Sequence, residues 1–234
     1  MNTPDKFSFY KEHPKTCEPD DFWGQVMRTV NGKPVGEEQI QMIIDSVIST
    51  LEITESDVLL DLCCGNGALT DRLFKVCQGG FGVDFSEPLI DTARRYFQVL
   101  PHRNYLLSDI EDYLRNTSDP QRFTKCLCYG SFMFLPDDKA VTVLRQIHSR
   151  FRHINRVYIG NLPDRERLSN FLAGRNLQDI TTNDPSSPIG IWRTGNEFAE
   201  LAGASGWRVH IQQMPDEFYA AAYRFDALLS REED

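Results

Sequence analysis

The chain has 234 residues, of which 25 are basic and 34 acidic, and its formal net charge at pH 7 is −9. With 41% hydrophobic and 25% charged residues, the composition is typical of a folded globular protein and excludes a disordered one. Because gripping a phosphate backbone requires concentrated positive charge, the acid excess argues against a nucleic acid as the main partner.

No stretch approaches 18 consecutive apolar residues, so we expect no membrane-spanning helix. The first twenty residues are polar and lack the apolar core of a secretory signal. None of the six cysteines belongs to a C-x-x-C pair, which predicts no structural zinc or other metal site. We interpret them as small apolar core residues of a cytoplasmic protein, and they are Cys17, Cys63, Cys64, Cys77, Cys126 and Cys128.

The first 56 residues are expected to form a helical cap. Apolar residues recur with helical spacing over residues 37–51, and a second helix is expected over residues 20–30. The sequence Asn-Gly-Lys-Pro at residues 31–34 predicts a turn between them. Residues 57–234 would then form the main domain.

Short apolar runs alternate with amphipathic ones from residue 57 to about residue 162. We expect strands at residues 58–62, 81–84, 105–107, 126–129 and 157–160. Helices are expected between them, including one that ends near residue 77, one that Ser86 caps and one over residues 138–152. This alternation predicts βαβ units and a mainly parallel sheet.

The last part of the chain departs from the alternation. Residues 165–173 are expected to be helical, residues 181–193 to form a loop, and Thr194 with Glu197 to cap another helix. Two strands over residues 207–213 and 218–229 are joined by four residues, which demands an antiparallel pair. The predicted fold is a doubly wound, mainly parallel seven-stranded sheet with an antiparallel last strand, a three-layer α/β/α sandwich under the N-terminal cap.

A glycine-rich turn follows the first strand of this sheet, with the sequence Asp-Leu-Cys-Cys-Gly-Asn-Gly at residues 61–67. Glycines there let the backbone approach a ligand, and the following helix offers unpaired N–H groups. A nicotinamide dinucleotide fingerprint would place a third glycine at Thr70 and would not need Asp61. An ordinary strand-to-helix turn and a nicotinamide-dependent oxidoreductase are therefore both disfavoured.

Two more acids end the next two predicted strands. Asp84 follows Gly67 by 17 residues, where a carboxylate suits both hydroxyls of a ribose, and Asp109 suits an exocyclic amine. Ligands of open α/β sheets bind at the carboxyl ends of the strands. Together with Asp61, these acids predict a nucleoside-containing ligand at that edge.

These residues resemble the motifs of the class I (Rossmann-like) S-adenosylmethionine-dependent methyltransferases. The matching segments are residues 61–67, the Gly-Val-Asp-Phe-Ser of residues 82–86, the Ser-Asp-Ile of residues 108–110 and, more loosely, residues 128–132. The resemblance covers about residues 57–229. One departure is the Cys63-Cys64 pair, where the family most often has Gly-Cys or a similar small pair, and Cys63 is small enough to leave cofactor binding intact.

The resemblance implies S-adenosylmethionine as the cofactor and assigns contacts with it. Asp61 would reach the methionine ammonium, Asp84 the ribose diol, and Asp109 with the N–H of Ile110 the adenine edge. The remaining assigned contacts are Cys63, Gly65 and Gly67 of the turn, Phe85 on the adenine, and the Tyr129 carbonyl near the ammonium.

Trp23 and Arg28 are five residues apart on the helix expected over residues 20–30. Arg28 is a candidate partner of the methionine carboxylate, because a guanidinium suits that planar group. The alternative is a solvated helix charge.

Catalytic residues are the least certain part of the sequence-based prediction, because the cofactor carries the reactive methyl group. A general base is needed only when the acceptor ionises poorly. Among the histidines, only His13 is placed to cover the cofactor, and an exposed terminal histidine is the alternative. Asn161 and Asp164, after the fifth predicted strand, are candidates for meeting a polar acceptor.

Four further features are candidates for the acceptor side. Arg165 would suit an acidic acceptor, residues 132–134 an apolar wall and residues 181–192 a lid. Tyr219 and Tyr223 are candidates for the wall of the site or for the core, and core packing is the favoured interpretation.

The sequence thus predicts a methyltransferase that acts on oxygen or nitrogen of a small molecule, such as a sugar, a nucleotide-sugar or a natural-product intermediate. We expect a monomer or homodimer without a membrane partner. The alternative is a methyltransferase-like module that binds the cofactor or another protein without turnover.

Overall fold

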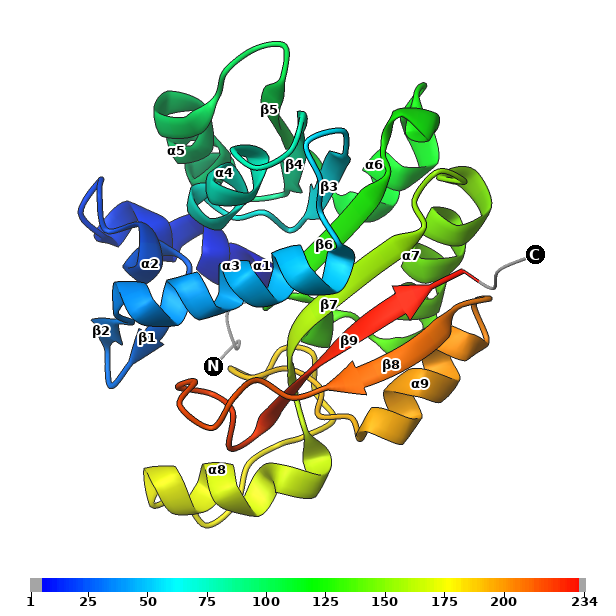
Figure 1. Ribbon diagram of the computed structural model, residues 1–234. Helices are drawn as coiled ribbons and strands as arrows, with labels where there is room; N and C mark the ends of the chain where they lie inside the picture. The colour runs from blue at the N-terminus through cyan, green and yellow to red at the C-terminus, as the bar shows by residue number, and fades with distance from the viewer. Residues whose placement is uncertain (1–5, 232–234) are drawn as a thin grey trace.

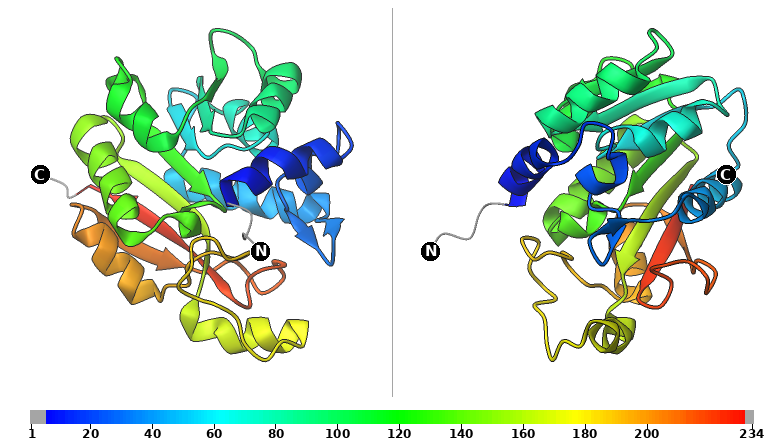
Figure 2. Two further views of the ribbon diagram at one scale, coloured as in Figure 1. Left: turned by 180° about the vertical axis from the view of Figure 1, so that it is seen from behind. Right: turned by 90° about the vertical axis from the view of Figure 1, so that its left-hand side faces the viewer.

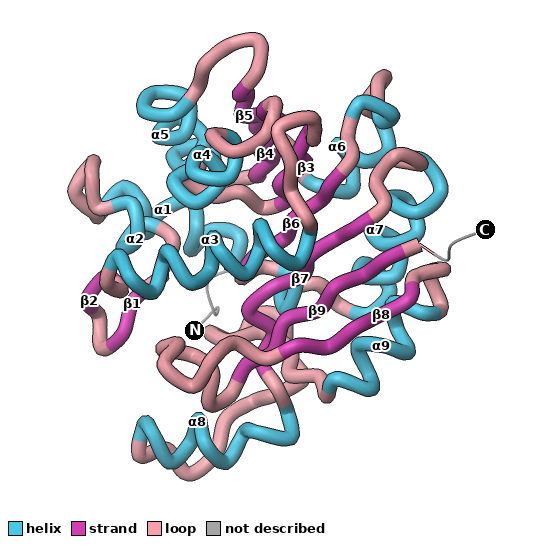
Figure 3. Tube along the Cα trace, viewed as in Figure 1, coloured by secondary structure: helices cyan, strands magenta, loops and turns pink. Residues whose placement is uncertain are grey.

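The computed structural model describes residues 6–231, in which a seven-stranded sheet is covered by helices on both faces (Figure 1). The strand order is β5-β4-β3-β6-β7-β9-β8. Helices α3, α4 and α5 lie on one face, and α6, α7 and α9 on the other (Figure 3). This is the expected three-layer sandwich.

The strands of the main sheet are β3 (Val58–Leu62), β4 (Gly79–Asp84), β5 (Arg103–Leu107), β6 (Lys125–Tyr129), β7 (Arg156–Pro163), β8 (Arg208–Gln212) and β9 (Arg224–Ser230). The helices are α1 (Lys6–Glu12), α2 (Phe22–Gln25), α3 (Glu37–Leu51), α4 (Ala68–Phe74), α5 (Glu87–Phe97), α6 (Ile110–Asn116), α7 (Asp137–Arg150), α8 (Leu168–Arg175) and α9 (Gly195–Gly203). Short 3-10 turns occur at His13–Thr16, Pro120–Arg122, Phe132–Phe134 and Arg165–Arg167. No helix among the described residues is long and apolar enough to cross a membrane.

Five neighbouring strands, β3 to β7, are parallel, and β9 runs antiparallel between β7 and β8. The predicted fold class, a mainly parallel sheet with an antiparallel last strand, is confirmed. The register of β7 against β9 shifts between Ile159 and Leu162, and Asn161 adopts a left-handed φ of 64° there. The irregularity lies at the carboxyl edge of the sheet.

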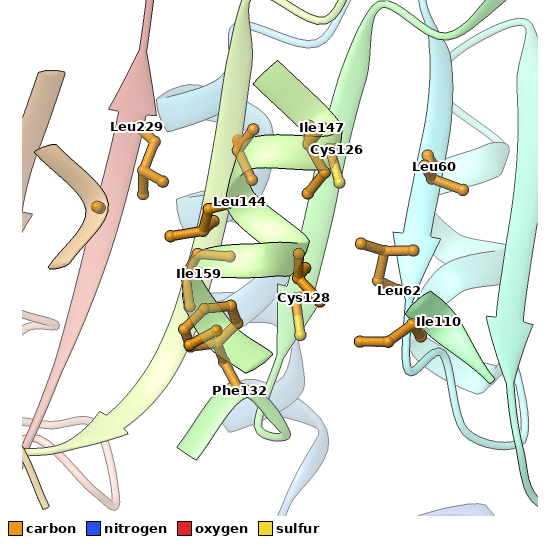
Figure 4. Packing of buried hydrophobic residues seen from close by; sticks show 14 of the residues in the cluster. Leu60, Leu62, Ile110, Cys126, Cys128, Phe132, Leu144, Ile147, Ile159 and Leu229 are labelled. Atoms are coloured by element: carbon orange, nitrogen blue, oxygen red, sulfur yellow. The ribbon is translucent and has the colours of Figure 1, made fainter. Parts of the chain in front are cut away.

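The core is built from apolar side chains that alternate along these strands. Figure 4 shows Leu60, Leu62, Cys126, Cys128 and Ile159 of the sheet packed against side chains of the covering helices. On the opposite face, α3 buries its apolar stripe, which consists of Ile40, Ile43, Ile44, Val47 and Leu51. Each such side chain contributes about 1.5–3 kcal/mol when fully buried. All six cysteines are free, and only Cys126 and Cys128 are fully buried.

The expected helix over residues 20–30 is wrong beyond residue 25. Asp21 caps the short helix α2 by accepting the N–H of Gly24 at 2.9 Å, and Met27 then adopts a left-handed φ of 55°. Two short strands, β1 (Thr29–Val30) and β2 (Lys33–Pro34), follow and pair through a turn at residues 31–32. Asn-Gly favours a hairpin turn because both positions accept positive φ. The turn was expected, but it joins strands rather than helices.

The expected strand over residues 218–229 begins only at Arg224. Residues 213–223 form successive turns, in which the N–H of Phe218 bonds to the carbonyl of Pro215 and that of Ala221 to the carbonyl of Phe218. Phe218, Ala220 and Ala221 are buried against the α3 side of the core. Their apolar character therefore reflects packing of a folded loop rather than of a strand.

Candidate functional site

A cavity of about 360 Å³ lies at the carboxyl ends of β3, β4, β6 and β7. Figure 2 shows helix α1 and the loop of residues 176–194 at the edge to which the arrowheads of the parallel strands point. Nine of the residues expected to bind the cofactor line this cavity: Arg28, Asp61, Cys63, Gly65, Asp84, Phe85, Asp109, Ile110 and Tyr129. The sequence-based site is thus brought together at one place.

Asp84 ends β4 and is held by two backbone donors. Its Oδ2 accepts the N–H of Gly65 at 2.9 Å, and its Oδ1 accepts that of Ser86 at 2.9 Å. Burial raises the pKa of this carboxyl to about 6, against the lowering effect of the backbone bonds. The carboxylate is therefore fixed in orientation and lies 4% exposed at the cavity wall.

Asp61, in β3, lies beside Asp84 and is equally buried. Its Oδ2 accepts a hydrogen bond of 2.5 Å from the hydroxyl of Thr70 in α4. Burial raises its pKa to about 7, while the Thr70 bond and the Arg28 charge lower it and the Asp84 charge raises it. The site thus holds two carboxyls that titrate near neutrality.

The glycine-rich turn has two glycines with different surroundings. Gly65 has a φ of +59° and lines the cavity, and a Cβ there would lie 2.9 Å from Cγ1 of Val26. Gly67 begins α4 with a φ of +77°, and its Cβ would lie 2.7 Å from the ring of Tyr105. Gly67 does not line the cavity. The structure therefore indicates that close packing, and not ligand contact, requires a glycine at this position.

Asn66, between these glycines, ties the turn to the N-terminal segment. Its Nδ2 donates to the carbonyl of Phe22 at 2.7 Å and to Oε1 of Gln25 at 2.8 Å. Gln25 in turn donates to the carbonyls of Glu18 and Pro19. Sequence analysis did not single out Asn66, and an asparagine between two glycines was the available signal.

Arg28 lies at the cavity although it is not on a helix with Trp23, as had been expected. Its guanidinium lies 5.4 Å from the Trp23 ring and 5.3 Å from the Tyr129 ring. Trp23 does not line the cavity and supports Arg28 from behind. The hydroxyl of Tyr129 is buried and has no hydrogen-bond partner among the described residues.

At the far end of the site, Asp109 caps α6. Its exposed carboxylate accepts the N–H of Glu111 at 2.8 Å and, at 3.3 Å, that of Asp112. Ser86 begins α5 as expected, but its hydroxyl donates to the carbonyl of Tyr10 at 2.6 Å instead of capping the helix. The start of α5 thereby anchors α1 beside the cavity.

Beyond Tyr129 the cavity continues along a second wall. Asn161, Met133, Phe134 and Tyr219 line it, and the buried Oδ1 of Asn161 has no hydrogen-bond partner among residues 6–231. Sequence analysis missed further lining residues, among them Tyr10, Arg175 and Arg224. They come from segments without motifs, which only the tertiary fold brings to the site.

Several candidates lie elsewhere. The Nε2–H of His13 donates to the carbonyl of Gly24 at 3.0 Å and the ring stacks on Phe9, so His13 does not line the cavity. Asp164 accepts the N–H of Glu166 at 3.0 Å and lines a different, shallow hollow. Phe132 belongs to the core. In the described part of the chain, no three His, Cys, Asp or Glu side chains are grouped to hold a metal ion.

Comparisons with known proteins agree with this architecture. Residues 59–153 match a family model described as a methyltransferase domain. The probable cobalt-precorrin-6B C(15)-methyltransferase (decarboxylating) of Methanococcus vannielii is 29% identical over 89 residues, which are 37% of this chain and 48% of that protein. The ubiquinone biosynthesis O-methyltransferase of Coxiella burnetii is 39% identical over 80 residues, 34% of this chain and 33% of that protein. The matches thus span less than half the length of these curated relatives.

A solved structure extends the likeness over the whole fold. The magnesium protoporphyrin IX methyltransferase of Synechocystis PCC 6803, crystallised with bound SAH, superposes with a TM-score of 0.67 at 16% identity, over 96% of this chain and 97% of that one. The architecture is therefore that of a Rossmann-like α/β domain with its cavity at the carboxyl edge of the sheet. The resemblance to the class I S-adenosylmethionine-dependent methyltransferases is confirmed, in that residues 59–153 match a methyltransferase domain and the fold is shared with a methyltransferase crystallised with SAH.

Proposed function

We propose that the chain is an S-adenosylmethionine-dependent methyltransferase that methylates oxygen or nitrogen of a small molecule. The observation that carries this proposal is the placement of Asp61, Asp84 and Gly65 on one wall of a cavity that continues past Tyr129 to a separate wall. One wall suits a cofactor, and the other leaves room for an acceptor. Relatives whose names state methyl transfer to different small molecules support the class of reaction and leave the acceptor open.

The residues present fit this cofactor. Asp61 and Asp84 are buried carboxyls without an ion-pair partner among the side chains described, those of residues 8–231, and a ligand with an ammonium and a diol supplies what they lack. Arg28 is free to pair with the methionine carboxylate from its place over Tyr129. Asp109, Ile110 and Phe85 would hold the adenine, and Cys63 and Gly65 would lie along the methionine and ribose.

The bound cofactor supplies an electrophilic methyl group on a sulfonium sulfur. The protein's own residues bind the two reactants in line and exclude water from the space between them. No histidine lines the cavity among the described residues, so we infer that the acceptor atom is one that ionises without a histidine base. Asn161 remains the proposed polar contact of the acceptor, through its buried and unpaired Oδ1.

The N-terminal segment is proposed to act as a lid over this site. Val26, Met27 and Arg28 line the cavity, and Asn66 bonds to the segment that precedes them. A cavity of about 360 Å³ is at the lower end of the range of about 300–1,000 Å³ in which small-molecule sites fall. It suits a small acceptor, and we propose neither a nucleic acid nor a membrane as partner.

Calorimetric titration with S-adenosylhomocysteine tests cofactor binding, and transfer of labelled methyl from S-adenosylmethionine to a metabolite extract tests turnover. Binding together with labelling of a small-molecule fraction supports the proposal. Binding without transfer to any fraction, including protein and RNA, would favour the alternative, a module that holds the cofactor without turnover. Absence of binding would contradict both.

A further inference from the structure

The second wall of the cavity carries two arginines that the proposed cofactor contacts do not use. Arg224 begins β9 and donates from Nη1 to the carbonyl of Asn161. Arg175 ends α8, and its guanidinium lies 4.1 Å from the centre of the Phe171 ring. Both guanidinium groups lie 5.3 Å from the centre of the Tyr223 ring, so they converge on one aromatic side chain.

Neither arginine forms an ion pair among the described residues, although the charge of Arg224 lowers the pKa of Asp226 from a greater distance. Among residues 6–231, no carboxylate lies within 4.0 Å of either guanidinium. The nearest acid along β9 is Asp226, whose two oxygens already accept the Tyr158 hydroxyl at 2.7 Å and the N–H of Asn161 at 2.6 Å. Asp226 is 2% exposed and is not part of the cavity wall.

The acidic side chains of the cavity are therefore confined to one end of it. The carboxylates in its lining, Asp61, Asp84, Asp109 and Glu111, belong to the end formed by β3, β4 and β5, and Lys139 pairs with Glu111 at 3.5 Å. Besides Asn161, the second wall has apolar and aromatic side chains, which include Met133, Phe134, Ile189 and Tyr219. A guanidinium does not lose its proton, so its charge in such surroundings is best balanced by an anion.

The two positions differ in exposure. Arg224 is half-buried, whereas Arg175 is exposed at the end of α8. Both positive charges also lower the pKa of the Tyr223 hydroxyl against the raising effect of its burial. A ligand entering the cavity would meet Arg175 first and Arg224 at the inner wall.

We propose that the methyl acceptor is a small organic anion whose carboxylate, or an equivalent oxyanion, is bound by Arg224 and drawn in by Arg175. This inference rests on the proposed function and names the substrate class of the same site. A planar carboxylate pairs with a guanidinium through two parallel hydrogen bonds, which fixes the orientation of the acceptor as well as its position. Its acceptor atom would then face the cofactor half of the cavity.

The test uses the full chain saturated with S-adenosylhomocysteine and three probes on one skeleton: benzoate, benzamide and phenyl phosphate. Ligand-observed NMR titration measures the affinity of each. We expect benzoate to bind at least about tenfold more tightly than benzamide, because a charge-assisted bond contributes about 1.5–3 kcal/mol. Phenyl phosphate binding more tightly than benzoate would identify a phosphate as the oxyanion.

Variants assign the effect to the two arginines. Arg224→Gln should weaken benzoate binding about tenfold or more and Arg224→Lys by less. Arg175→Gln should also weaken it by less, through slower association. Arg208→Gln, on exposed β8 outside the cavity, is the matched control and should change nothing. Affinity for S-adenosylhomocysteine should stay within about twofold in each variant.

Equal affinities of benzoate and benzamide, no binding of either anion, or unchanged benzoate affinity in both Arg224→Gln and Arg175→Gln would overturn the inference. Failure of S-adenosylhomocysteine to bind the unmodified chain would instead contradict the proposed function. Arg224→Gln removes a hydrogen bond to the backbone of Asn161, so the thermal midpoint of this variant is measured in parallel. If Arg224→Gln does not fold, the benzoate affinity of Arg175→Gln decides the test.

Discussion

The hydroxyl of Thr70 donates a hydrogen bond of 2.5 Å to Oδ2 of Asp61, across the glycine-rich turn that separates β3 from α4. This bond stabilises the carboxylate, yet burial outweighs it and leaves the pKa of Asp61 at about 7. Asp84 beside it has a pKa of about 6. The charge of this site in the protein without ligand therefore changes within the physiological pH range. The affinity for the proposed cofactor should depend on that charge.

Cofactor binding should strengthen as the pH rises from 5.5 to 8. A ligand with an ammonium binds the ionised form of Asp61, so binding at pH 6.5 should release protons. Affinity should change by at most about tenfold per pH unit for each group. Calorimetry with S-adenosylhomocysteine in buffers of different ionisation enthalpy measures the release. Asp61→Asn should flatten the upper part of the profile, and a pH-independent affinity of the unmodified chain would contradict the assignment.

The stability of the unliganded protein should move the other way. A carboxyl whose pKa is raised on folding binds protons more tightly in the folded state, so its contribution favours folding at low pH. That contribution is lost as the pH rises from about 4 through 6 and 7, the values for Asp84 and Asp61. Thermal midpoints of Asp61→Asn and the unmodified chain should therefore differ more at pH 8 than at pH 5, with the variant higher at pH 8. Equal differences at both pH values would argue against the raised pKa.

Asp84→Ala should weaken S-adenosylhomocysteine binding by about 2 kcal/mol or more, because it removes charge-assisted bonds to the ribose. It also leaves the N–H groups of Gly65 and Ser86 without their acceptor. Asp109→Ala is the informative comparison, since that carboxylate is exposed and already caps α6. A smaller loss is expected there. If Asp84→Ala bound as tightly as the unmodified chain, its proposed role would be lost.

Arg28→Ala should raise the dissociation constant of S-adenosylhomocysteine by about tenfold or more, because a charge-assisted bond to the carboxylate is lost. Trp23→Ala should have a smaller effect in the same direction, since Trp23 only supports Arg28. Arg72→Ala, which removes the other cation over the Trp23 ring, is the control and should leave affinity unchanged. An unaltered dissociation constant in Arg28→Ala would contradict the proposed role and support the alternative, a solvated charge.

Asn66→Ala should loosen the N-terminal segment without unfolding the sheet. The two bonds to that segment that it removes, at 2.7 and 2.8 Å, contribute about 1 kcal/mol each. The variant also removes the acceptor of the Ala68 N–H, at 3.3 Å. Hydrogen exchange should become faster in residues 18–28 and stay unchanged in β3, β4 and β6. Leu177→Ala, an exposed position in the loop after α8, serves as control. Unchanged exchange in residues 18–28 would show that Asn66 does not hold the segment.

The two glycines of the turn should respond differently to alanine. Gly67→Ala places a Cβ against the rings of Tyr105 at a φ of +77°, and it should lower the free energy of unfolding by about 1–3 kcal/mol. Gly65→Ala meets only Val26, which belongs to the segment covering the site, and should mainly weaken cofactor binding. Urea titration and calorimetry on both variants check this, and identical profiles would contradict it.

The sequence predicted the elements whose pattern is local. Continuous apolar runs identified β3, β4, β6 and β7, and the acids at strand ends identified Asp61 and Asp84, because parallel strands bring their carboxyl ends to one edge. The helix expected over residues 20–30 failed because Asp21 and Met27 impose a local turn that apolar periodicity does not register.

The two arginines of the second wall, Arg175 and Arg224, escaped prediction for a different reason. Arg175 and Arg224 have no neighbour in the sequence that marks them, and they meet only because α8 and β9 pack against the same ring of Tyr223. Asp164 was expected at the site because it follows β7, but the register of β7 against β9 shifts between Ile159 and Leu162, where Asn161 is left-handed, and Asp164 lines a different hollow. Such placements depend on the whole fold.

Because β9 lies between β7 and β8, the two halves of the cavity are completed at different times during synthesis. A ribosome releases residues 58–109, which carry the carboxylate half, well before residues 224–230. Until that last strand emerges, β7 presents an open edge and β8 has no partner to pair with. Arg224 and the support of Asn161 by Asp226 arrive with it. The second wall of the cavity is therefore completed last, and a ribosome that stalls before residue 224 leaves a nascent chain whose second wall has Asn161 and Arg175 but lacks Arg224.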